Sequence, residues 1–195
     1  MSLEFAKEGF GKCISDARNL VNISLNFQSD NQKTALRGSL MLVVSAFDFF
    51  IHEIIRVETK RRISENPGSV KFEVPFNITA CGQDVLSIEV DLLIRKRNSI
   101  RSFVGSSKVK ECFSTVSIDI WSELENHKEI NVKEVRKRLD VIWAWRNRIA
   151  HEGDLVPSNS SFVYWEIYSS DVIDSADFLS GLAHDIVDVV EILAH

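Results

Sequence analysis

Residues 36–55 of the chain read LRGSLMLVVSAFDFFIHEII, and this stretch decides the fold. Its apolar residues recur at intervals of three and four, which is the spacing of one face of an α-helix. The face consists of Leu36, Leu40, Val43, Val44, Phe47, Ile51, Ile54 and Ile55. The pattern predicts a helix from about residue 32 to residue 63, roughly 45 Å long. A helix of this length with one apolar face needs other helices to cover it.

The same spacing marks further helices before and after this one. We expect them at about residues 10–25, 85–105, 119–127, 131–152 and 171–193. Residues 69–84 contain turn signals and are expected to form an irregular excursion, and the polar residues 106–117 are expected to form a loop. The sequence therefore predicts an all-α fold, an antiparallel bundle of about four main helices with a short irregular excursion in the middle. A chain of 195 residues, 45% of them hydrophobic, is most simply one domain over residues 1–195.

The late helix has clear start and stop signals. Asn131 and Glu134 are spaced as in a capping box, and Gly153 is a typical stop signal. We expect its buried stripe to consist of Val135, Leu139, Ile142, Trp143 and Ile149.

Composition and motifs argue against several classes of protein. The amino terminus lacks an apolar signal core, and the most apolar stretch carries acidic residues and a histidine, so we expect a cytoplasmic protein that does not contact a membrane. There is no G-x-S-x-G, Walker-type or G-x-G-x-x-G motif to support a serine hydrolase or a nucleotide-binding fold. No CxxC occurs, so we expect no metal site and no cofactor, and reduced thiols at Cys13, Cys81 and Cys112.

The basic residues are unevenly distributed. The net charge is −5, yet all 23 Lys and Arg precede residue 152, whereas nine of the 28 acidic residues follow residue 151. The main clusters are Lys60, Arg61 and Arg62; Arg95, Lys96, Arg97, Arg101, Lys108 and Lys110; and Lys133, Arg136, Lys137 and Arg138. Such clusters can hold a phosphate backbone, and the alternative is that each is a solvated helix face.

Residues 146–153, RNRIAHEG, end the late helix and bring a guanidinium, an amide and an imidazole close together. On an α-helix Asn147 and His151 lie on one face, and Arg146 lies about 100° round the axis, near enough for its long side chain to reach them. These groups can cleave a phosphodiester without a metal ion.

An all-helical chain with Arg-Asn-x-x-x-His near the end of a late helix resembles the HEPN superfamily, and Arg146 to Asp154 is similar to the motif of its RiboL-PSP-like branch. The similarity extends over about residues 30–190, through the early long helix with its embedded Asp48, the middle excursion and the closing helix. The resemblance implies a homodimer whose motif helices meet at the interface. It also implies a metal-independent endoribonuclease in a toxin–antitoxin or antiphage system, although some members are inactive binding proteins.

If the resemblance holds, each motif residue has a role. His151 is the candidate general acid or base, Arg146 binds the non-bridging phosphate oxygens, and Asn147 orients His151 or binds the sugar-phosphate. Asp48, with His52 one turn later, joins this pocket. We expect RNA contacts from Arg148, Arg95, Lys96, Arg97 and Arg101.

Several alternatives remain open at this point. The first alternative is that the motif is structural, with Arg146 paired to Glu152 or Asp154 and His151 serving only to cap helix carbonyls. The second alternative is that the chain is a non-catalytic HEPN module, which uses the motif to bind RNA, a nucleotide or a cognate partner protein such as an antitoxin. A purely structural dimerisation bundle would make the motif incidental.

Overall fold

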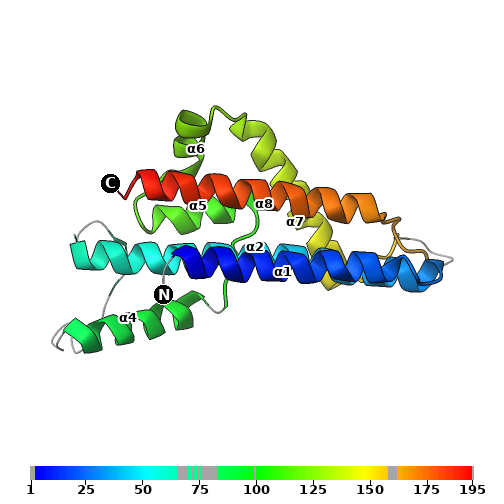
Figure 1. Ribbon diagram of the computed structural model, residues 1–195, viewed down its shortest axis with the longest axis horizontal. Helices are drawn as coiled ribbons and strands as arrows, with labels where there is room; N and C mark the ends of the chain where they lie inside the picture. Colours follow the sequence, from blue (N-terminus) through cyan, green and yellow to red (C-terminus); the bar gives the residue numbers. More distant parts are fainter. Residues whose placement is uncertain are drawn as a thin grey trace.

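The computed structural model describes residues 3–65, 70, 71, 73, 75, 83–98, 100–157 and 162–194. The described chain is mostly helical, which confirms the all-α fold class, and the helices pack as a bundle (Figure 1). Ten of the sixteen residues of the expected excursion over residues 69–84, Cys81 among them, lie outside the described residues. The helices are α1 (Leu3–Ser24), α2 (Ser29–Glu65), α4 (Gln83–Asn98), α5 (Ser106–Ser114), α6 (Ile120–Lys128), α7 (Val132–Glu152) and α8 (Ser169–Ile192).

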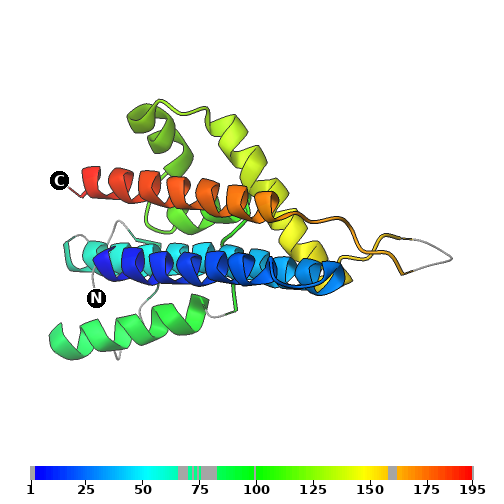
Figure 2. The same cartoon turned by 45° about the vertical axis from the view of Figure 1, so that its right-hand side comes forward.

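The core of the bundle lies between α1, α2 and α8, which run side by side in Figures 1 and 2. The apolar face predicted for α2 is buried, and Leu40, Phe47, Ile51 and Ile54 are each 0% exposed. Burying each such side chain contributes roughly 1.5–3 kcal/mol, so this one stripe supplies a large part of the driving force for folding. The prediction for α2 is confirmed, and the helix extends a few residues beyond both expected ends.

α1 begins earlier than the apolar spacing predicts and passes through two glycines. Gly9 stands where α1 meets α2, because a Cβ on this residue would come 2.7 Å from Cε1 of Phe49. A glycine weakens a helix by itself, but here it lets the two helices approach closely. The hydroxyl of Ser39 donates a hydrogen bond of 2.7 Å to the carbonyl of Ala17 at the same interface.

Residues 106–114 form helix α5, so the prediction of a loop there was wrong. The helix buries Val109, Cys112 and Phe113, which are spaced three and four apart. At its first residue, the backbone N–H and the hydroxyl of Ser106 each donate a hydrogen bond of 2.7 Å to the carboxylate of Asp140. Asp140 belongs to α7, so the start signal of α5 comes from a distant part of the chain.

α7 begins where the sequence predicts. The side-chain oxygen of Asn131 accepts a hydrogen bond of 3.3 Å from the N–H of Glu134, and Leu139 and Ile142 are buried. The helix crosses the bundle obliquely in Figures 1 and 2, so only part of its length faces the core.

Trp143 is one residue of α7 for which the expected burial was wrong. Its side chain is 37% exposed and lies against Gly105, where a Cβ would come 3.3 Å from Cδ2 of the indole. The apolar spacing assigned Trp143 to the core, but the oblique crossing of α7 carries it to the edge of the bundle.

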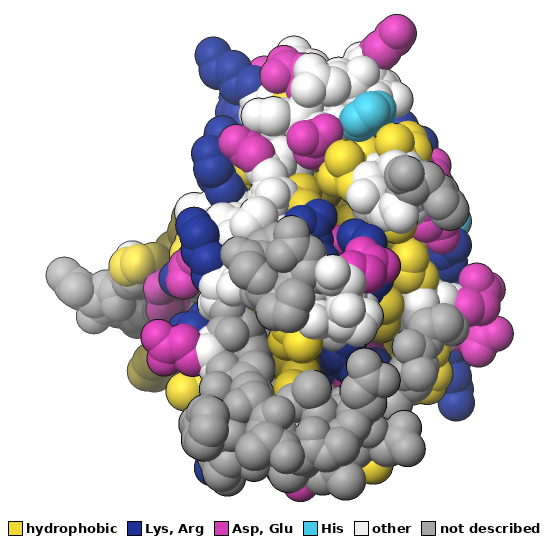
Figure 3. Space-filling view, turned by 90° about the vertical axis from the view of Figure 1, so that its left-hand side faces the viewer, with side chains coloured by type: hydrophobic (Ala, Val, Ile, Leu, Met, Phe, Trp, Pro, Cys, Tyr) yellow, Lys and Arg dark blue, Asp and Glu magenta, His cyan; other side chains and the backbone are white. Residues whose placement is uncertain are grey.

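The second half of α2 is charged, and its charges pair with one another and with α4. Arg56 and Glu58 are each 2% exposed, and Arg56 bonds to Glu53 on α2 and to Asp91 on α4. Figure 3 views the end of the molecule that faces left in Figure 1, and Lys and Arg side chains alternate there with Asp and Glu side chains. Within the described residues, no helix combines the length and the apolar character needed to cross a membrane.

Candidate functional site

The three motif residues lie in the last two turns of α7, at the end of the helix that faces α2. Arg146 and Asn147 are half-buried, and His151 is exposed to solvent. Nη1 of Arg146 donates a hydrogen bond of 3.0 Å to Oδ1 of Asn147. His151 lies four residues after Asn147 on the same helix face, so the amide, guanidinium and imidazole border one open surface.

Arg148 occupies a different environment from its neighbours in the motif. Its Nε donates a hydrogen bond of 2.6 Å to Oδ1 of Asp154, and Nε of Arg37 donates one of 2.7 Å to Oδ2 of the same carboxylate. Asp154 is 0% exposed. Asp154, one of the two carboxylates that could have neutralised Arg146, is therefore held by two other guanidinium groups. The guanidinium of Arg148 is thus occupied by contacts within the protein. Its contribution to RNA binding stays a prediction.

The chain turns back immediately after the motif and fixes the end of α7 to α2. Gly153 and Asp154 both have left-handed backbone conformations, with φ of 63° and 58°. The N–H of Trp165 donates a hydrogen bond of 3.0 Å to the carbonyl of Asp154, and Nη2 of Arg37 donates one of 2.6 Å to the carbonyl of Trp165. The guanidinium of Arg148 stacks over the indole of Trp165 at 4.9 Å. Two arginines and one buried carboxylate thus hold the motif end in place.

Asp48 lies in a separate pocket within the single chain. Its carboxylate accepts a hydrogen bond of 2.7 Å from the N–H of Phe103, and Nε2 of His52 lies 3.6 Å from Oδ1. An open pocket of about 410 Å³ is lined by Asp48 and His52 together with Arg95 and Arg101. The structure therefore groups Asp48 with two of the predicted RNA-binding residues and not with Arg146, Asn147 and His151. A catalytic role for Asp48 stays a prediction.

The predicted RNA-binding residues on and after α4 differ in their contacts. Arg95 forms ion pairs with Asp91 and Glu53, with nitrogen-to-oxygen distances of 3.1 and 3.4 Å. Arg101 is exposed, and its carbonyl accepts a hydrogen bond of 3.1 Å from Nε2 of His52. Lys96 and Arg97 are exposed near the end of α4. Part of this basic run is therefore committed to contacts within the protein.

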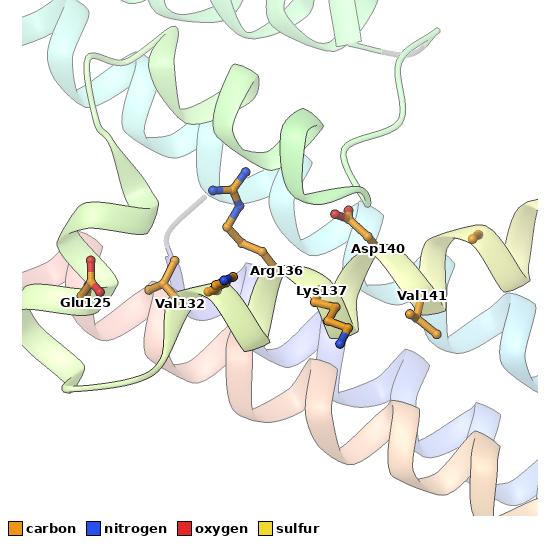
Figure 4. Close-up of a pocket in the computed structure, with 8 residues that line it drawn as sticks. Glu125, Val132, Arg136, Lys137, Asp140 and Val141 are labelled. Carbon is orange, nitrogen blue, oxygen red and sulfur yellow. The ribbon is translucent and has the colours of Figure 1, made fainter.

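A basic groove on the first half of α7 is absent from the predicted site residues. It has a volume of about 690 Å³, and its lining includes Lys133, Arg136 and Lys137. Figure 4 shows Arg136, Lys137, Asp140 and Val141 following one another along the helix, with Glu125 at the far end of the groove. The cluster is visible in the sequence, but the sequence alone did not show that these three cations form no ion pair with a carboxylate among the described residues.

α7 also exposes apolar surface beside the motif. Val141 is 59% exposed and Ala144 is exposed, although both lie on the helix that carries Asn147 and His151. The four residues are spaced three, three and four apart, so they form one stripe along α7. This stripe begins apolar and ends polar.

Metal ligands are not clustered in the described part of the chain. Among those residues, no group of three or more His, Cys, Asp or Glu side chains is placed to hold a metal ion. Burial raises the pKa of the Cys112 thiol, which disfavours the thiolate that metals prefer. Cys81 lies outside the described residues.

Comparison with known proteins gives one match. The family model described as RiboL-PSP-HEPN matches residues 12–191, which include the whole of α2 and α7, all but one residue of α8 and the second half of α1. No curated protein and no solved structure matches the chain.

Proposed function

Because the chain belongs to the RiboL-PSP-HEPN family, we propose that it is a metal-independent endoribonuclease that acts as a homodimer in a toxin–antitoxin or antiphage system. The observation that carries this proposal is the placement of Arg146, Asn147 and His151 at the solvent-facing end of α7. A histidine kept only for stability would be expected to have a partner within the protein. His151 instead projects into solvent beside a half-buried guanidinium.

The proposed reaction uses the 2′-hydroxyl of the RNA as the nucleophile. This oxygen attacks the adjacent phosphorus, the bond from phosphorus to the 5′-oxygen breaks, and the products carry a 2′,3′-cyclic phosphate and a 5′-hydroxyl. His151 moves a proton, either from the attacking hydroxyl or to the leaving oxygen. Arg146 stabilises the charge that builds on the non-bridging oxygens, and its bond to Asn147 uses only one of its five N–H groups.

The exposed stripe of α7 supports the homodimer. Val141 and Ala144 are apolar, exposed and within two turns of Asn147. If two copies meet through these residues about a twofold axis, the two motif ends come to lie near each other. A cognate antitoxin or defence-system protein would then regulate a site shared between two chains.

A cleavage assay tests the proposal. Purified wild-type protein should cut single-stranded RNA in the presence of EDTA and leave 2′,3′-cyclic phosphate ends. His151→Ala should reduce cleavage by roughly 10²–10⁴-fold, because it removes the proton-transfer group. The matched control is His184→Ala, at an exposed histidine on α8, which should cleave like the wild type.

Three outcomes contradict parts of this proposal. Cleavage that requires added magnesium and leaves 5′-phosphate ends overturns the mechanism. An active, folded His151→Ala protein removes the motif from the chemistry. RNA binding without cleavage in the wild type favours a non-catalytic module, and a monomer in sedimentation at micromolar concentration removes the shared site.

A further inference from the structure

The cations on the first half of α7 are unusual for this protein because the described structure brings no acidic partner to them. Among the described residues, Lys133, Arg136 and Lys137 have no carboxylate within ion-pair distance. The helix as a whole carries six Lys and Arg against three Asp and Glu, in a chain whose net charge is −5. A positive helix on an acidic protein favours a polyanionic partner.

The two carboxylates that line the same groove do not neutralise these cations. Asp140 is engaged by the N–H and the hydroxyl of Ser106, each at 2.7 Å. Glu125 stands on α6, at the end of the groove farther from the motif (Figure 4). The guanidinium of Arg136 lies 6.0 Å from the ring centroid of Trp121, a contact that helps to hold it in place. The groove therefore presents positive charge to solvent.

The groove leads toward the motif. Lys133 and Lys137 are four residues apart on one side of α7, and Asn147 follows Lys137 by ten residues on the same helix. In the proposed homodimer the partner covers Val141 and Ala144, so the strand passes beside this contact on its way to the motif. From Lys137 to Asn147 the helix rises roughly 15 Å, which exceeds the separation of adjacent phosphates in a nucleic acid strand. A strand on this side of the helix would thus present one phosphate to the motif end, where the side chain of Arg146 reaches round to Asn147, and other phosphates to the groove.

We propose that this groove binds backbone phosphates of a single-stranded RNA, several nucleotides from the bond that is cut. The inference rests on the proposed ribonuclease function and adds that the substrate is an extended strand. The three flexible cations would contact phosphates and not bases. The groove would therefore increase affinity for the RNA and orient the strand along α7, with little preference for base sequence. A single strand fits better than a duplex, because attack in line by the 2′-hydroxyl needs a backbone free to leave the A-form helix.

The test removes the three charges and measures how binding depends on salt. In a His151→Ala background, the protein with Lys133→Gln, Arg136→Gln and Lys137→Gln is titrated against a fluorescein-labelled single-stranded RNA long enough to cover α7. Each lost phosphate contact lowers the slope of log affinity against log salt by about 0.7, so the slope should fall by roughly 2. Affinity at low salt should fall roughly tenfold or more.

The control removes the same charge elsewhere. Lys7→Gln, Lys12→Gln and Lys33→Gln change lysines on α1 and α2 that lie outside the three basic clusters, and they should leave the slope and the affinity nearly unchanged. With His151 intact, the groove variant should cleave a dinucleotide substrate at the wild-type rate and a long RNA more slowly. All the substitutions lie on the surface, so melting temperatures should stay close to that of the wild type.

Each other outcome overturns the inference. An unchanged salt slope in the groove variant shows that the groove does not hold the RNA, even if the wild type cleaves normally. Equal losses in the groove and control variants show a general charge effect, and equal affinity for duplex RNA contradicts the substrate class. A changed sedimentation mass in the groove variant makes the groove a contact between copies. A wild type that neither binds nor cleaves RNA overturns the proposed function as well.

Discussion

At the end of α2, Arg61 and Arg62 both bond to the buried carboxylate of Glu58, whereas Lys133, Arg136 and Lys137 on α7 meet no carboxylate among the described residues. The two clusters look alike in the sequence, since each has three or four cations within a short span. The difference comes from the acidic residues around them. Asp140 also stands one turn from Arg136, but its carboxylate is bonded to Ser106 and not to the cation. A basic run becomes part of the protein's own framework where a nearby acid pairs with it, and stays available to a partner where the nearby acid is engaged elsewhere.

The α2 cluster is built into a network that also includes α4. Burial by itself raises the pKa of Glu58, but hydrogen bonds from Arg61 and Arg62 outweigh it, and the pKa lies below its usual value. Asp91 shows the same balance, because the bonds from Arg56 and Arg95 outweigh its burial and lower its pKa. These carboxylates are therefore stabilised in their charged form, and the network ties α4 to α2.

The sharpest way to separate arginines that act on a partner from arginines that hold the fold is to remove one from the motif end of α7 and one from the α2 cluster. Arg146→Ala should slow RNA cleavage by roughly 10²–10³-fold, because it removes a donor to the charge that develops on the phosphate. It should leave the free energy of unfolding nearly unchanged, since among the described residues Arg146 bonds only to its neighbour Asn147. Arg61→Ala should do the reverse: cleavage should change little, and the melting temperature should fall. Single-turnover cleavage and thermal melts on both variants measure the two effects.

Arg146→Lys refines this prediction. A lysine keeps the charge but not the forked set of donors, so it should retain RNA affinity better than cleavage rate. Equal losses of affinity and rate in this variant would assign Arg146 to binding alone.

The next largest effect concerns Glu58. Glu58→Ala leaves Arg61 and Arg62 without their shared carboxylate, and we expect the free energy of unfolding to fall by about 3 kcal/mol, the low end for breaking a buried ion pair. The low end applies because both arginines keep some contact with water. Urea denaturation followed by circular dichroism measures the change. A control, Glu134→Ala on α7, removes an exposed carboxylate and should change stability by no more than about 0.5 kcal/mol.

The smallest predicted effect is a pH dependence of stability. Because the pKa of Glu58 is lowered on folding from its usual value of 4.5, its contribution is fully present above that pH and is lost as the pH falls through the folded-state pKa. The melting temperature of the wild type should therefore drop in mild acid more steeply than that of Glu58→Gln. Parallel pH profiles for the two proteins would show that the carboxylate of Glu58 contributes no such stabilisation.

Much of the fold follows from local patterns in the sequence. The apolar stripe of α2 and the cap at Asn131 both depend on residues within a few positions of each other, and the structure confirms both. α5 carried a short signal of the same kind in Val109, Cys112 and Phe113, which the sequence analysis missed among polar residues. Its start could not be found locally, because its first turn is held by Asp140, 34 residues later. Trp143 was misplaced for a related reason, since apolar spacing cannot show that α7 crosses the bundle obliquely.

The site was predictable in part. The family match confirms the resemblance that was drawn from Arg146, Asn147 and His151, while the roles of these residues stay predictions. The contacts of Arg148 with Asp154 and Trp165 depend on a turn that the sequence analysis did not foresee. One signal was present and overlooked. Glu58 precedes Arg61 and Arg62 by three and four residues, and Asp91 precedes Arg95 by four, which is the helix spacing that favours ion pairs. The same spacing relates Arg136 to Asp140, whose carboxylate bonds to Ser106 instead, so spacing favours a pair without fixing it.

The bond between Arg37 and Asp154 also sets an order of assembly for the newly made chain. The two residues stand 117 positions apart, so their contact closes a long loop at a substantial cost in chain entropy. α1 and α2 need only the first 65 residues to pack against each other, and amino-terminal parts generally fold first during synthesis. The end of the motif helix is fixed only after Trp165 has emerged from the ribosome. Under the proposed function, a ribonuclease assembled in this order has no finished site while most of its own messenger RNA is being translated.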